Sequence, residues 1–523
     1  MYFKEQKSKA NKKMNKFQTF LKRTGLDEKP FQTECFDWCL KREQRISAAN
    51  ISAANIKGGI LALEMGLGKT IIMLGLIECN FKRHTLIVLP RALLDQWEKH
   101  IQKYFGHNPL VYHGSRHKSL KMSLESIQDR PIVLTTYGQL SMPSLKQIRR
   151  GRKISALHKI KWNRLICDEG HHVSHSDTNE FKGVEALRTD IKWLVTGTPI
   201  QNNEQELYNL YSLLGLPKSL FYYEEGNNYA TTAQDFVFHR TKAGVGIVLP
   251  PLHEHNKIVQ WETEDERQFA EHIHSILACC NVPLTALAAE VKDRENPVGL
   301  HLKYMTKAKQ VCVYPHMLTI KACSYTSKIN ALIQTILERQ ANGCGKIVFC
   351  HYYAEIDAVE KRLLTHGFSV AKFDGRVPNG LRQHILSEPV DVLLAQIKMC
   401  REGLNLQDNY SEVYFPSPNF NPATEDQAIA RCWRIGQKKP VHVFRYIMEE
   451  PTGKEEANEE ANEEANEAAA NAHSMDSYSA LLQVEKRKFM DKLAQTHAQQ
   501  SSNAMQTHAQ QSSSSNANAC AAE

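Results

Sequence analysis

Gly58-Gly-Ile-Leu-Ala-Leu-Glu-Met-Gly-Leu-Gly-Lys-Thr70 is the stretch of sequence that decides the fold. It is typical of a loop that wraps phosphate groups with its backbone, because Gly66 and Gly68 can adopt dihedral angles closed to other residues and let N–H groups approach an anion. Lys69 supplies a positive charge for the β- and γ-phosphates, and the Thr70 hydroxyl is placed to bind magnesium. The apolar run that follows predicts a buried helix whose N-terminus faces the anion.

The stretch departs from the strict phosphate-loop pattern at one position. G-x-x-x-x-G-K-T requires a glycine at position 63, where this chain has Leu63. On this stretch alone two interpretations stay open. The first is a nucleotide phosphate loop, which the Gly-Lys-Thr ending favours, and the second is a glycine-rich turn that only closes a strand–helix unit.

Length and composition restrict the class of protein. A chain of 523 residues is too long for one hydrophobic core, so two or three domains are expected. The net charge of +8 favours a polyanionic partner without proving one. The 13 cysteines include no CxxC pair and indicate reduced thiols of a cytosolic or nuclear protein. No apolar run is long enough to span a bilayer and the N-terminus lacks the apolar core of a secretory signal, so we expect an intracellular protein that is not secreted and binds no membrane.

Short apolar runs alternate with helical segments along most of the chain. Runs at 85–90, 131–136, 164–167 and 193–196 predict buried strands, and residues 92–104 predict a helix between two of them. A second series follows, with predicted strands at 346–350, 390–394, 412–415 and 441–445 and a helix at 354–364. Each series predicts an α/β lobe with a mostly parallel sheet and helices on both faces.

The regions outside these two series differ in composition. The lysine-rich N-terminus predicts a solvated arm, with a phosphate contact or an import signal as the alternative. The repeated Glu-Glu-Ala-Asn after the second lobe predicts a flexible insert, because glutamates four residues apart repel one another on a helix. The predicted divisions are a basic flexible arm (1–25), a first lobe (26–240), connector and accessory helices (241–325), a second lobe (326–450), an acidic low-complexity insert (451–473), a helix docked back on the core (474–494) and a disordered tail (495–523).

Two adjacent acids follow a predicted strand of the first lobe. Asp168 and Glu169 are delivered to the carboxyl end of that strand, where ligands bind in open α/β sheets. We expect Asp168 to hold magnesium and Glu169 to act as the general base that activates water, the alternative being an exposed acidic turn. His171, His172 and His175 follow, but no H-E-x-x-H motif and no cysteine pair accompany them, so a zinc site is not expected.

Two further segments have the composition of a nucleotide site. Thr196 and Thr198 follow another predicted strand, and their hydroxyls could link the nucleotide to a moving part of the protein, although the segment alone is an ordinary turn. In the second lobe Gln427, Arg431 and Arg434 are spaced i, i+4, i+7 and are predicted to share one helical face. Guanidinium groups suit a transferring phosphoryl group, the alternative being a salt-bridged surface.

Taken together, these segments resemble the ordered motifs of Swi/Snf-type ATPases of helicase superfamily two. Gln32, the stretch 58–70 and the residue pair Asp168–Glu169 all take part in this resemblance, which extends from about residue 28 to about residue 495. The compact build is similar to the copies of this family carried by large DNA viruses. The matching segments are GGILALEMGLGKT, TLIVLP, VLTTYG, DEGHH, LVTGTPIQNN, GLNL and QAIARCWRIGQ, with the shorter phrases Leu93-Leu-Asp-Gln-Trp97, Arg240-Thr-Lys242 and Ser327-Lys328.

The resemblance implies two RecA-like lobes that hold ATP and magnesium between them and move along duplex DNA. It implies a helix near 477–493 that braces back to the first lobe. The implied roles are adenine contact by Gln32, phosphate binding by Met65, Gly66, Leu67, Gly68, Lys69 and Thr70, magnesium on Thr70 and Asp168, Glu169 as base, Arg431 and Arg434 at the γ-phosphate, and coupling to nucleic acid by Thr196, Thr198, Gly403, Asn405 and Gln427.

The chain departs from the family pattern at several positions without losing a catalytic group. Leu63 replaces an acid and Gly170 replaces alanine, whereas the changes at 174–175, 399–402 and 416–418 bear on nucleic-acid preference. We therefore expect a nucleic-acid-dependent ATPase that translocates on duplex DNA. An ATP-dependent RNA helicase is the alternative, because such a fold does not determine the polymer. A clamp that binds ATP without hydrolysing it is disfavoured because Glu169 and Arg434 are both present.

Overall fold

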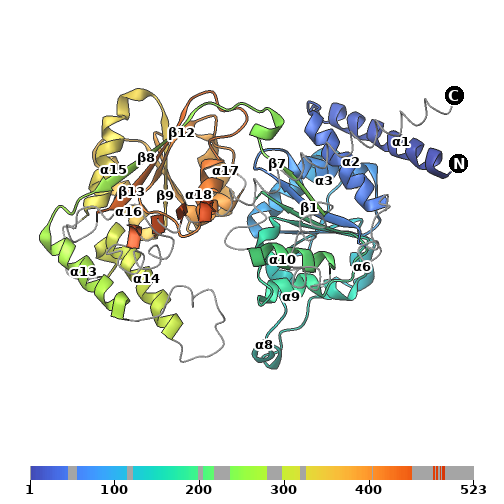
Figure 1. The fold of residues 1–523 in the computed structure, drawn as a ribbon, viewed down its shortest axis with the longest axis horizontal. Coiled ribbons are helices and arrows are strands. Elements are labelled where there is room, and N and C mark those ends of the chain that lie inside the picture. The colour runs from blue at the N-terminus through green and yellow to red at the C-terminus, as the bar shows by residue number, and fades with distance from the viewer. Residues whose placement is uncertain are drawn as a thin grey trace, which may run out of the picture. The chain divides into compact units, whose positions relative to one another are not determined.

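The computed structural model describes most of the two predicted α/β lobes. The chain divides into two compact units between Val248 and Leu249, here called lobe 1 and lobe 2, with Lys488 the last residue of lobe 2 (Figure 1). The described residues are 2–44, 56–114, 122–197, 204–216, 236–279, 297–318, 326–402, 404–449, 475–477, 479–480, 483–484 and 486–488.

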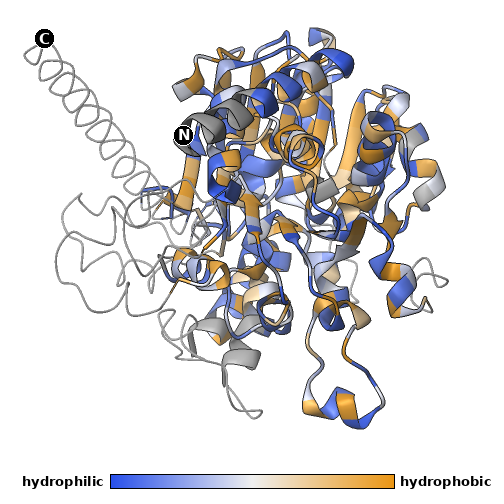
Figure 2. Ribbon diagram, turned by 90° about the vertical axis from the view of Figure 1, so that its right-hand side faces the viewer, coloured by the Kyte–Doolittle hydropathy of each residue, from blue (hydrophilic) through white to orange (hydrophobic). Residues whose placement is uncertain are grey.

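Lobe 1 contains one sheet, in which every neighbouring pair of strands is parallel. The order of strands is β3-β4-β2-β5-β6-β1-β7. The predicted parallel sheet is therefore confirmed, and the hydrophobic colour of its strands in Figure 2 fits burial on both faces. The strands are β1 (Gly58–Leu63), β2 (Thr85–Leu89), β3 (Leu110–Val111), β4 (Ile132–Thr136), β5 (Arg164–Asp168), β6 (Lys192–Thr196) and β7 (Val237–Arg240).

Helices cover both faces of this sheet. Alternate residues of each strand enter two separate cores, as the period of two along a strand requires: Ile60 joins one core and Leu61 the other. The helices are α1 (Tyr2–Arg23), α2 (Pro30–Gln44), α3 (Lys69–Cys79), α4 (Leu94–Phe105), α6 (Leu124–Gln128), α7 (Tyr137–Leu140), α8 (Leu145–Arg149), α9 (Asn179–Glu185) and α10 (Glu204–Leu214), with short 3₁₀ helices at Arg91–Leu93, Ala156–Lys159, Gly170–Val173 and Ala243–Val245.

The N-terminal region differs from its prediction. The flexible arm expected over residues 1–25 is wrong, because Tyr2–Arg23 form helix α1. Phe17 and Phe20 of α1 are buried in the core of lobe 1, and the ring of Phe17 stacks on Phe36 with centroids 4.1 Å apart. Apolar side chains at helical spacing therefore dock α1 on the lobe. The lysines of the same helix hide this pattern in the sequence.

Lobe 2 contains a second parallel sheet, in the order β10-β11-β9-β12-β13-β8. Its strands are β8 (Leu252–Val259), β9 (Gly345–Cys350), β10 (Val370–Phe373), β11 (Val392–Gln396), β12 (Tyr410–Phe415) and β13 (Val441–Met448). Its helices are α13 (Glu264–Cys279), α14 (Pro297–Val313), α15 (Ser327–Glu338), α16 (Tyr353–Thr365), α17 (Asn379–Ser387) and α18 (Pro422–Ile429), with 3₁₀ helices at Pro315–Met317, Gln340–Asn342 and Ile397–Glu402.

The region expected to connect the lobes belongs to lobe 2 from Leu249 onward. Strand β8 lies within it and forms the edge of the second sheet, paired with β13 from Leu252↔Val441 to Val259↔Met448. The sequence prediction missed β8 because most of its side chains are polar and exposed. An edge strand can be held by backbone hydrogen bonds on one side only, and it then shows no buried apolar pattern.

The C-terminal part of the chain is described only in pieces. The acidic insert (451–473) and the tail (495–523) lie outside the described residues. Of the predicted brace, the described residues between Met475 and Lys488 are helical, and they belong to lobe 2. Within the ranges that the structure describes, no helix is both long enough and apolar enough to cross a membrane.

Candidate active site

The topology of the first sheet brings the predicted nucleotide residues to one edge. Strand β6 lies between β1 and β5, and all three run in the same direction. The predicted phosphate loop follows β1, Asp168 ends β5 and Thr196 ends β6. Because the carboxyl ends of parallel strands meet at the same edge, these three groups of residues are neighbours, as the sequence predicts.

The phosphate loop is shorter than the stretch quoted from the sequence. Gly58–Leu63 form the buried strand β1, so the loop itself covers only residues 64–68. Gly66 and Gly68 have φ angles of 91° and 85°, in the left-handed region that favours glycine. Gly68 is also the N-cap of α3, so the loop leads directly into the N-terminus of a helix.

The side chain of Gln32, in α2, holds this loop by a hydrogen bond. Its Nε2 atom donates to the carbonyl oxygen of Leu67 at 3.1 Å, and its side chain is buried. A Cβ atom on Gly68 would lie 2.5 Å from the same Nε2 atom. A side chain at position 68 would therefore require the Gln32 amide to move from its place against the loop.

Lys69 lies where the loop, β1 and β6 meet. Its Nζ atom donates to the carbonyl oxygen of Leu63 at 2.9 Å. A Cβ atom on Gly197 would be 3.2 Å from Nζ and 3.2 Å from Cγ of Met65, so the end of β6 passes close to the lysine. Leu63 is extended and buried at the end of β1, which explains why a glycine is not needed there. Thr70 is the second residue of α3.

Asp168 is held by three neighbours. Trp97 Nε1 donates to its Oδ2 atom at 2.8 Å, and the backbone N–H of Glu169 donates to Oδ1 at 3.0 Å. The hydroxyl of Tyr137 donates to the backbone carbonyl of Asp168 at 2.6 Å. Burial, followed by the nearby charge of Glu169, raises the pKa of Asp168 to about 6. The carboxyl group is thus fixed in place and lacks the solvation that would stabilise its charge.

Glu169 is the one residue other than glycine with a positive φ among those described, at 50°. Backbone strain of this kind is concentrated at functional sites, where the surrounding structure imposes it. Gly170 follows, and a Cβ there would meet Leu194 Cβ at an ordinary 3.5 Å. The alanine usual in the family would fit, so the exchange to Gly170 does not alter the turn.

His171 links the acidic turn to the end of β6. Its Nδ1 atom lies 3.2 Å from Thr196 Oγ1 and 3.4 Å from Glu169 Oε2. Thr196 therefore contacts the acidic turn through one histidine. Thr198 lies outside the described residues. Across the part of the chain that is described, no group of three or more His, Cys, Asp or Glu side chains is arranged to hold a metal ion.

Sequence reasoning assigned no role to several residues that build this site. Glu64 of the loop pairs with Lys242, with Oε1 2.8 Å from Nζ and Oε2 accepting from the backbone N–H at 2.7 Å. Trp97 and Tyr137 position Asp168 as described above. Lys242, Trp97 and Tyr137 all occur in segments that carry the family resemblance. The sequence therefore pointed to these residues, but no role was predicted for them.

In lobe 2 the two arginines do not share a helical face. Helix α18 ends at Ile429, and Arg431 and Arg434 lie in the turns that follow, here called the arginine turn (residues 430–437). The backbone leaves the helix because its groups bond elsewhere: Leu406 N–H donates to the Arg431 carbonyl at 3.0 Å. Gly436, with a φ of 103°, continues the turn. The predicted i, i+4, i+7 face is therefore wrong beyond Gln427, which is buried in α18.

The arginine turn contacts the segment after the 3₁₀ helix Ile397–Glu402. A guanidinium N–H of Arg434 donates to Oδ1 of Asn405. Burial lowers the pKa of Arg434 from its ordinary value. Arg434, predicted to contact the γ-phosphate, is thus hydrogen-bonded to Asn405, predicted to take part in coupling to nucleic acid. Gly403 lies outside the described residues.

Comparisons with known proteins extend over both lobes. The family model of the SNF2-related domain matches residues 31–317, and that of the helicase conserved C-terminal domain matches residues 327–436. The probable global transactivator of Orgyia pseudotsugata multicapsid polyhedrosis virus is 25% identical, over 81% of this chain and 87% of that protein. The resemblance to a compact viral copy therefore has a counterpart among known proteins.

Other similar proteins are longer. The ATP-dependent DNA helicase DDM1 of Arabidopsis thaliana is 24% identical, over 81% of this chain and 59% of that protein. The DNA excision repair protein ERCC-6-like of Danio rerio is 25% identical, over 75% of this chain but only 33% of its own length. A solved SWI2/SNF2 ATPase core of Sulfolobus solfataricus in complex with dsDNA is 21% identical, with a TM-score of 0.36, and covers 81% of this chain and 88% of that one.

Proposed function

This chain belongs to the SNF2-related family of helicase-like ATPases, and we propose that it uses ATP hydrolysis to move along duplex DNA. The observation that carries the proposal is the edge of the first sheet, where Lys69, Asp168 and Glu169 follow strands that flank a common neighbour. A loop that binds phosphate at this edge would lie beside two carboxylates, which supports phosphoanhydride hydrolysis.

Binding of the triphosphate is assigned to the loop and to α3. Backbone N–H groups of residues 65–70, which include those of Met65, Leu67 and Thr70, would surround the β- and γ-phosphates at the positive end of the helix. Lys69 adds a charge at the junction with β6, and Gln32, bonded to the loop, would contact the adenine. Together, the loop, α3 and Gln32 would orient the γ-phosphate.

The oxygen donors beside the loop fit magnesium. Thr70 supplies a hydroxyl and Asp168 a carboxylate, which are the hard ligands that this ion prefers together with phosphate oxygens. The raised pKa of Asp168 fits the same role, because a buried carboxyl without a cation is poorly stabilised. When bound, magnesium supplies charge neutralisation at the phosphates. Glu169 would orient the attacking water and accept its proton.

Charge that develops on the γ-phosphate is assigned to Arg431 and Arg434. Guanidinium groups are permanently charged and form paired hydrogen bonds with phosphate oxygens. Because both residues belong to lobe 2, hydrolysis would depend on the two lobes closing on one nucleotide. The bond between Arg434 and Asn405 would connect this event to the coupling segment.

Duplex DNA is the proposed track. Two of the similar proteins are named as a DNA helicase and a DNA excision repair protein, which supports DNA over RNA. The net charge of +8 is compatible with contacts to a phosphate backbone. Duplex DNA as the track is a proposal, and so is the coupling role of Thr196, Thr198, Gly403, Asn405 and Gln427.

Steady-state ATP hydrolysis compared among three polymers tests this function. Duplex DNA, single-stranded DNA and RNA are supplied at equal nucleotide concentration, with Lys69→Ala as the inactive reference. The highest turnover number is expected with duplex DNA. A maximum with RNA would replace the proposal by an RNA helicase, and ATP binding without turnover on any polymer would replace it by a clamp.

A further inference from the structure

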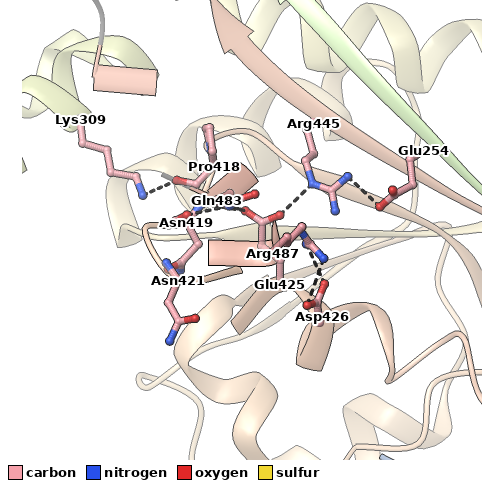
Figure 3. A network of polar contacts seen from close by, with 10 residues as sticks. All are labelled: Glu254, Lys309, Pro418, Asn419, Asn421, Glu425, Asp426, Arg445, Gln483 and Arg487. Carbon is pink, nitrogen blue, oxygen red and sulfur yellow. Dashed lines mark hydrogen bonds and ion pairs between the residues drawn. The ribbon is translucent and has the colours of Figure 1, made fainter. Parts of the chain in front are cut away.

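A polar network that the proposed reaction does not use lies directly before the arginine turn (Figure 3). At its centre is Glu425, in the first turn of α18, whose side chain is completely buried. Its Oε1 atom accepts from Asn419 N–H and from Gln483 Nε2, both at 2.7 Å, and its Oε2 atom accepts from Arg445 Nε at 2.8 Å. One carboxylate thus ties α18 to the preceding loop, to β13 and to the C-terminal segment.

The C-terminal segment contacts the start of α18 at further points. We call the described residues between Met475 and Lys488 the strap. Arg487 of the strap forms two hydrogen bonds with Asp426, at 2.8 Å and 3.2 Å. Lys486 Nζ donates to the carbonyl oxygen of Phe420 at 3.1 Å. The strap therefore holds both the loop before α18 and Asp426, the residue that follows Glu425 in α18.

The other end of the strap is anchored in the interior of lobe 2. Asp476 pairs with Lys328, and both side chains are fully buried. Lys328 Nζ also donates to Ser417 Oγ at 3.4 Å, and Lys309 Nζ donates to the Pro418 carbonyl at 2.5 Å. Ser417 and Pro418 belong to a segment that departs from the family pattern, and they contact two buried lysines, of which Lys328 pairs with Asp476 of the strap.

A short series of bonds leads from this network to the arginines. Ala430 N–H donates to the Asp426 carbonyl at 2.9 Å, and Arg431 N–H donates to the Ala428 carbonyl at 3.1 Å. The second half of α18, from Asp426 to Ala428, is thus joined to the arginine turn by two backbone hydrogen bonds. A displacement at Asp426 would therefore reach the backbone that carries Arg431.

We propose that Glu425 and Asp426 are positioning residues for the arginine turn, and that the strap acts on catalysis through them by way of Gln483 and Arg487. The inference rests on the proposed function, because it gives Arg431 and Arg434 their role at the γ-phosphate. When the strap is undocked, ATP still binds to lobe 1 but the arginines are misplaced. The kcat therefore falls, whereas the KM for ATP stays nearly unchanged.

The pair of Asp426 and Arg487 offers the sharpest test because it separates positioning from stability. Both side chains are about two-fifths exposed. The loss of an exposed ion pair has little effect on folding. A purely structural contact at this place would therefore change neither unfolding nor kcat appreciably, whereas a positioning contact changes kcat alone.

The experiment compares full-length variants in DNA-stimulated ATP hydrolysis. Asp426→Asn and Arg487→Gln remove the pair, and Asp426→Arg combined with Arg487→Asp restores it with the charges exchanged. Lys488→Gln is the matched control, since this neighbouring strap residue is exposed. We expect kcat to fall about fivefold in each single variant and to return to within about twofold of wild type in the exchanged pair.

The unfolding temperature and the KM for ATP, measured on the same proteins, should stay at their wild-type values. An active wild type with single variants that match Lys488→Gln would overturn the inference alone. The same holds if the exchanged pair fails to recover, or if KM rises in place of a fall in kcat. A wild type without nucleic-acid-stimulated hydrolysis would overturn the proposed function and with it this inference.

Discussion

The amide Nε2 of Gln32 lies 2.5 Å from the point where a side chain on Gly68 would begin. The same amide donates to the carbonyl of Leu67, so α2 and the phosphate loop share one tightly fitted contact. Gly68 also needs its φ of 85° to begin α3. Two independent requirements therefore fall on one glycine, and each can be tested by mutation.

Gly68→Ala should weaken ATP binding by at least about tenfold, because the added methyl group displaces the Gln32 amide and the backbone is strained. Gly106→Ala is the matched control: its φ is 74°, and no atom lies within 4 Å of the added Cβ. Titration with a fluorescent ATP analogue measures both. Equal affinities for the two variants would show that the contact with Gln32 is unimportant.

Phe17→Ala should destabilise lobe 1 by about 3–5 kcal/mol, since it removes a fully buried ring that stacks on Phe36. Phe81→Ala, with 61% of the side chain exposed, should change stability by less than about 0.5 kcal/mol. Chemical denaturation followed by circular dichroism gives both values. If Phe17→Ala were as stable as Phe81→Ala, α1 would be a dispensable arm after all.

Replacing residues 452–473 with a short Gly/Ser linker should leave ATP hydrolysis within about twofold of wild type. The described residues on either side of the insert are in contact, because Met448 N–H donates to Asp476 Oδ2 at 3.2 Å, and a shorter loop costs about 1 kcal/mol less to close. A longer deletion that includes Asp476 should destabilise lobe 2, because it leaves Lys328 buried without its ion-pair partner. Loss of hydrolysis on the shorter replacement would give the insert an active role.

The stability of lobe 2 should depend on pH through Lys309. Burial lowers the pKa of this lysine from 10.5 to about 8, although Asp476 and Glu425 oppose the change. Below about pH 8 the lysine is charged in both states and the cost of burying the charge is fully present. Between about pH 8 and 10.5 the folded state releases its proton first, so stability rises with pH.

Lys309→Met removes this titration and is the reference for the measurement. The wild type should gain up to about 3 kcal/mol relative to the variant as the pH rises through that window. Urea unfolding of the full chain at pH 7 and pH 10 measures the difference. Parallel changes in the two proteins would mean that Lys309 keeps an ordinary pKa.

Elements whose burial shows in their own residues could be predicted from the sequence. Buried parallel strands such as Arg164–Asp168 are short apolar runs, so sequence alone located them. Strand β8 and helix α1 were missed for opposite reasons. Backbone pairing to β13 holds β8 without buried side chains, and in α1 the lysines conceal the apolar positions around Phe17.

The site shows the same division. The glycines, Lys69 and the pair Asp168–Glu169 were predictable because their chemistry is carried by adjacent residues. The contact of Trp97 with Asp168 joins residues 71 positions apart, which no local pattern reports. The arginine turn was misassigned because bonds to distant backbone groups, such as that from Leu406 to Arg431, end the helix early.

In the proposed mechanism, one ATP is bound by lobe 1 and activated by arginines from lobe 2. The most direct measurement compares ATP affinity and DNA-stimulated kcat in wild type and Arg434→Ala. We expect an ATP affinity close to wild type and a kcat lower by roughly 10³-fold, the scale of an arginine that stabilises the transferring phosphate. An unchanged kcat in Arg434→Ala would contradict this mechanism.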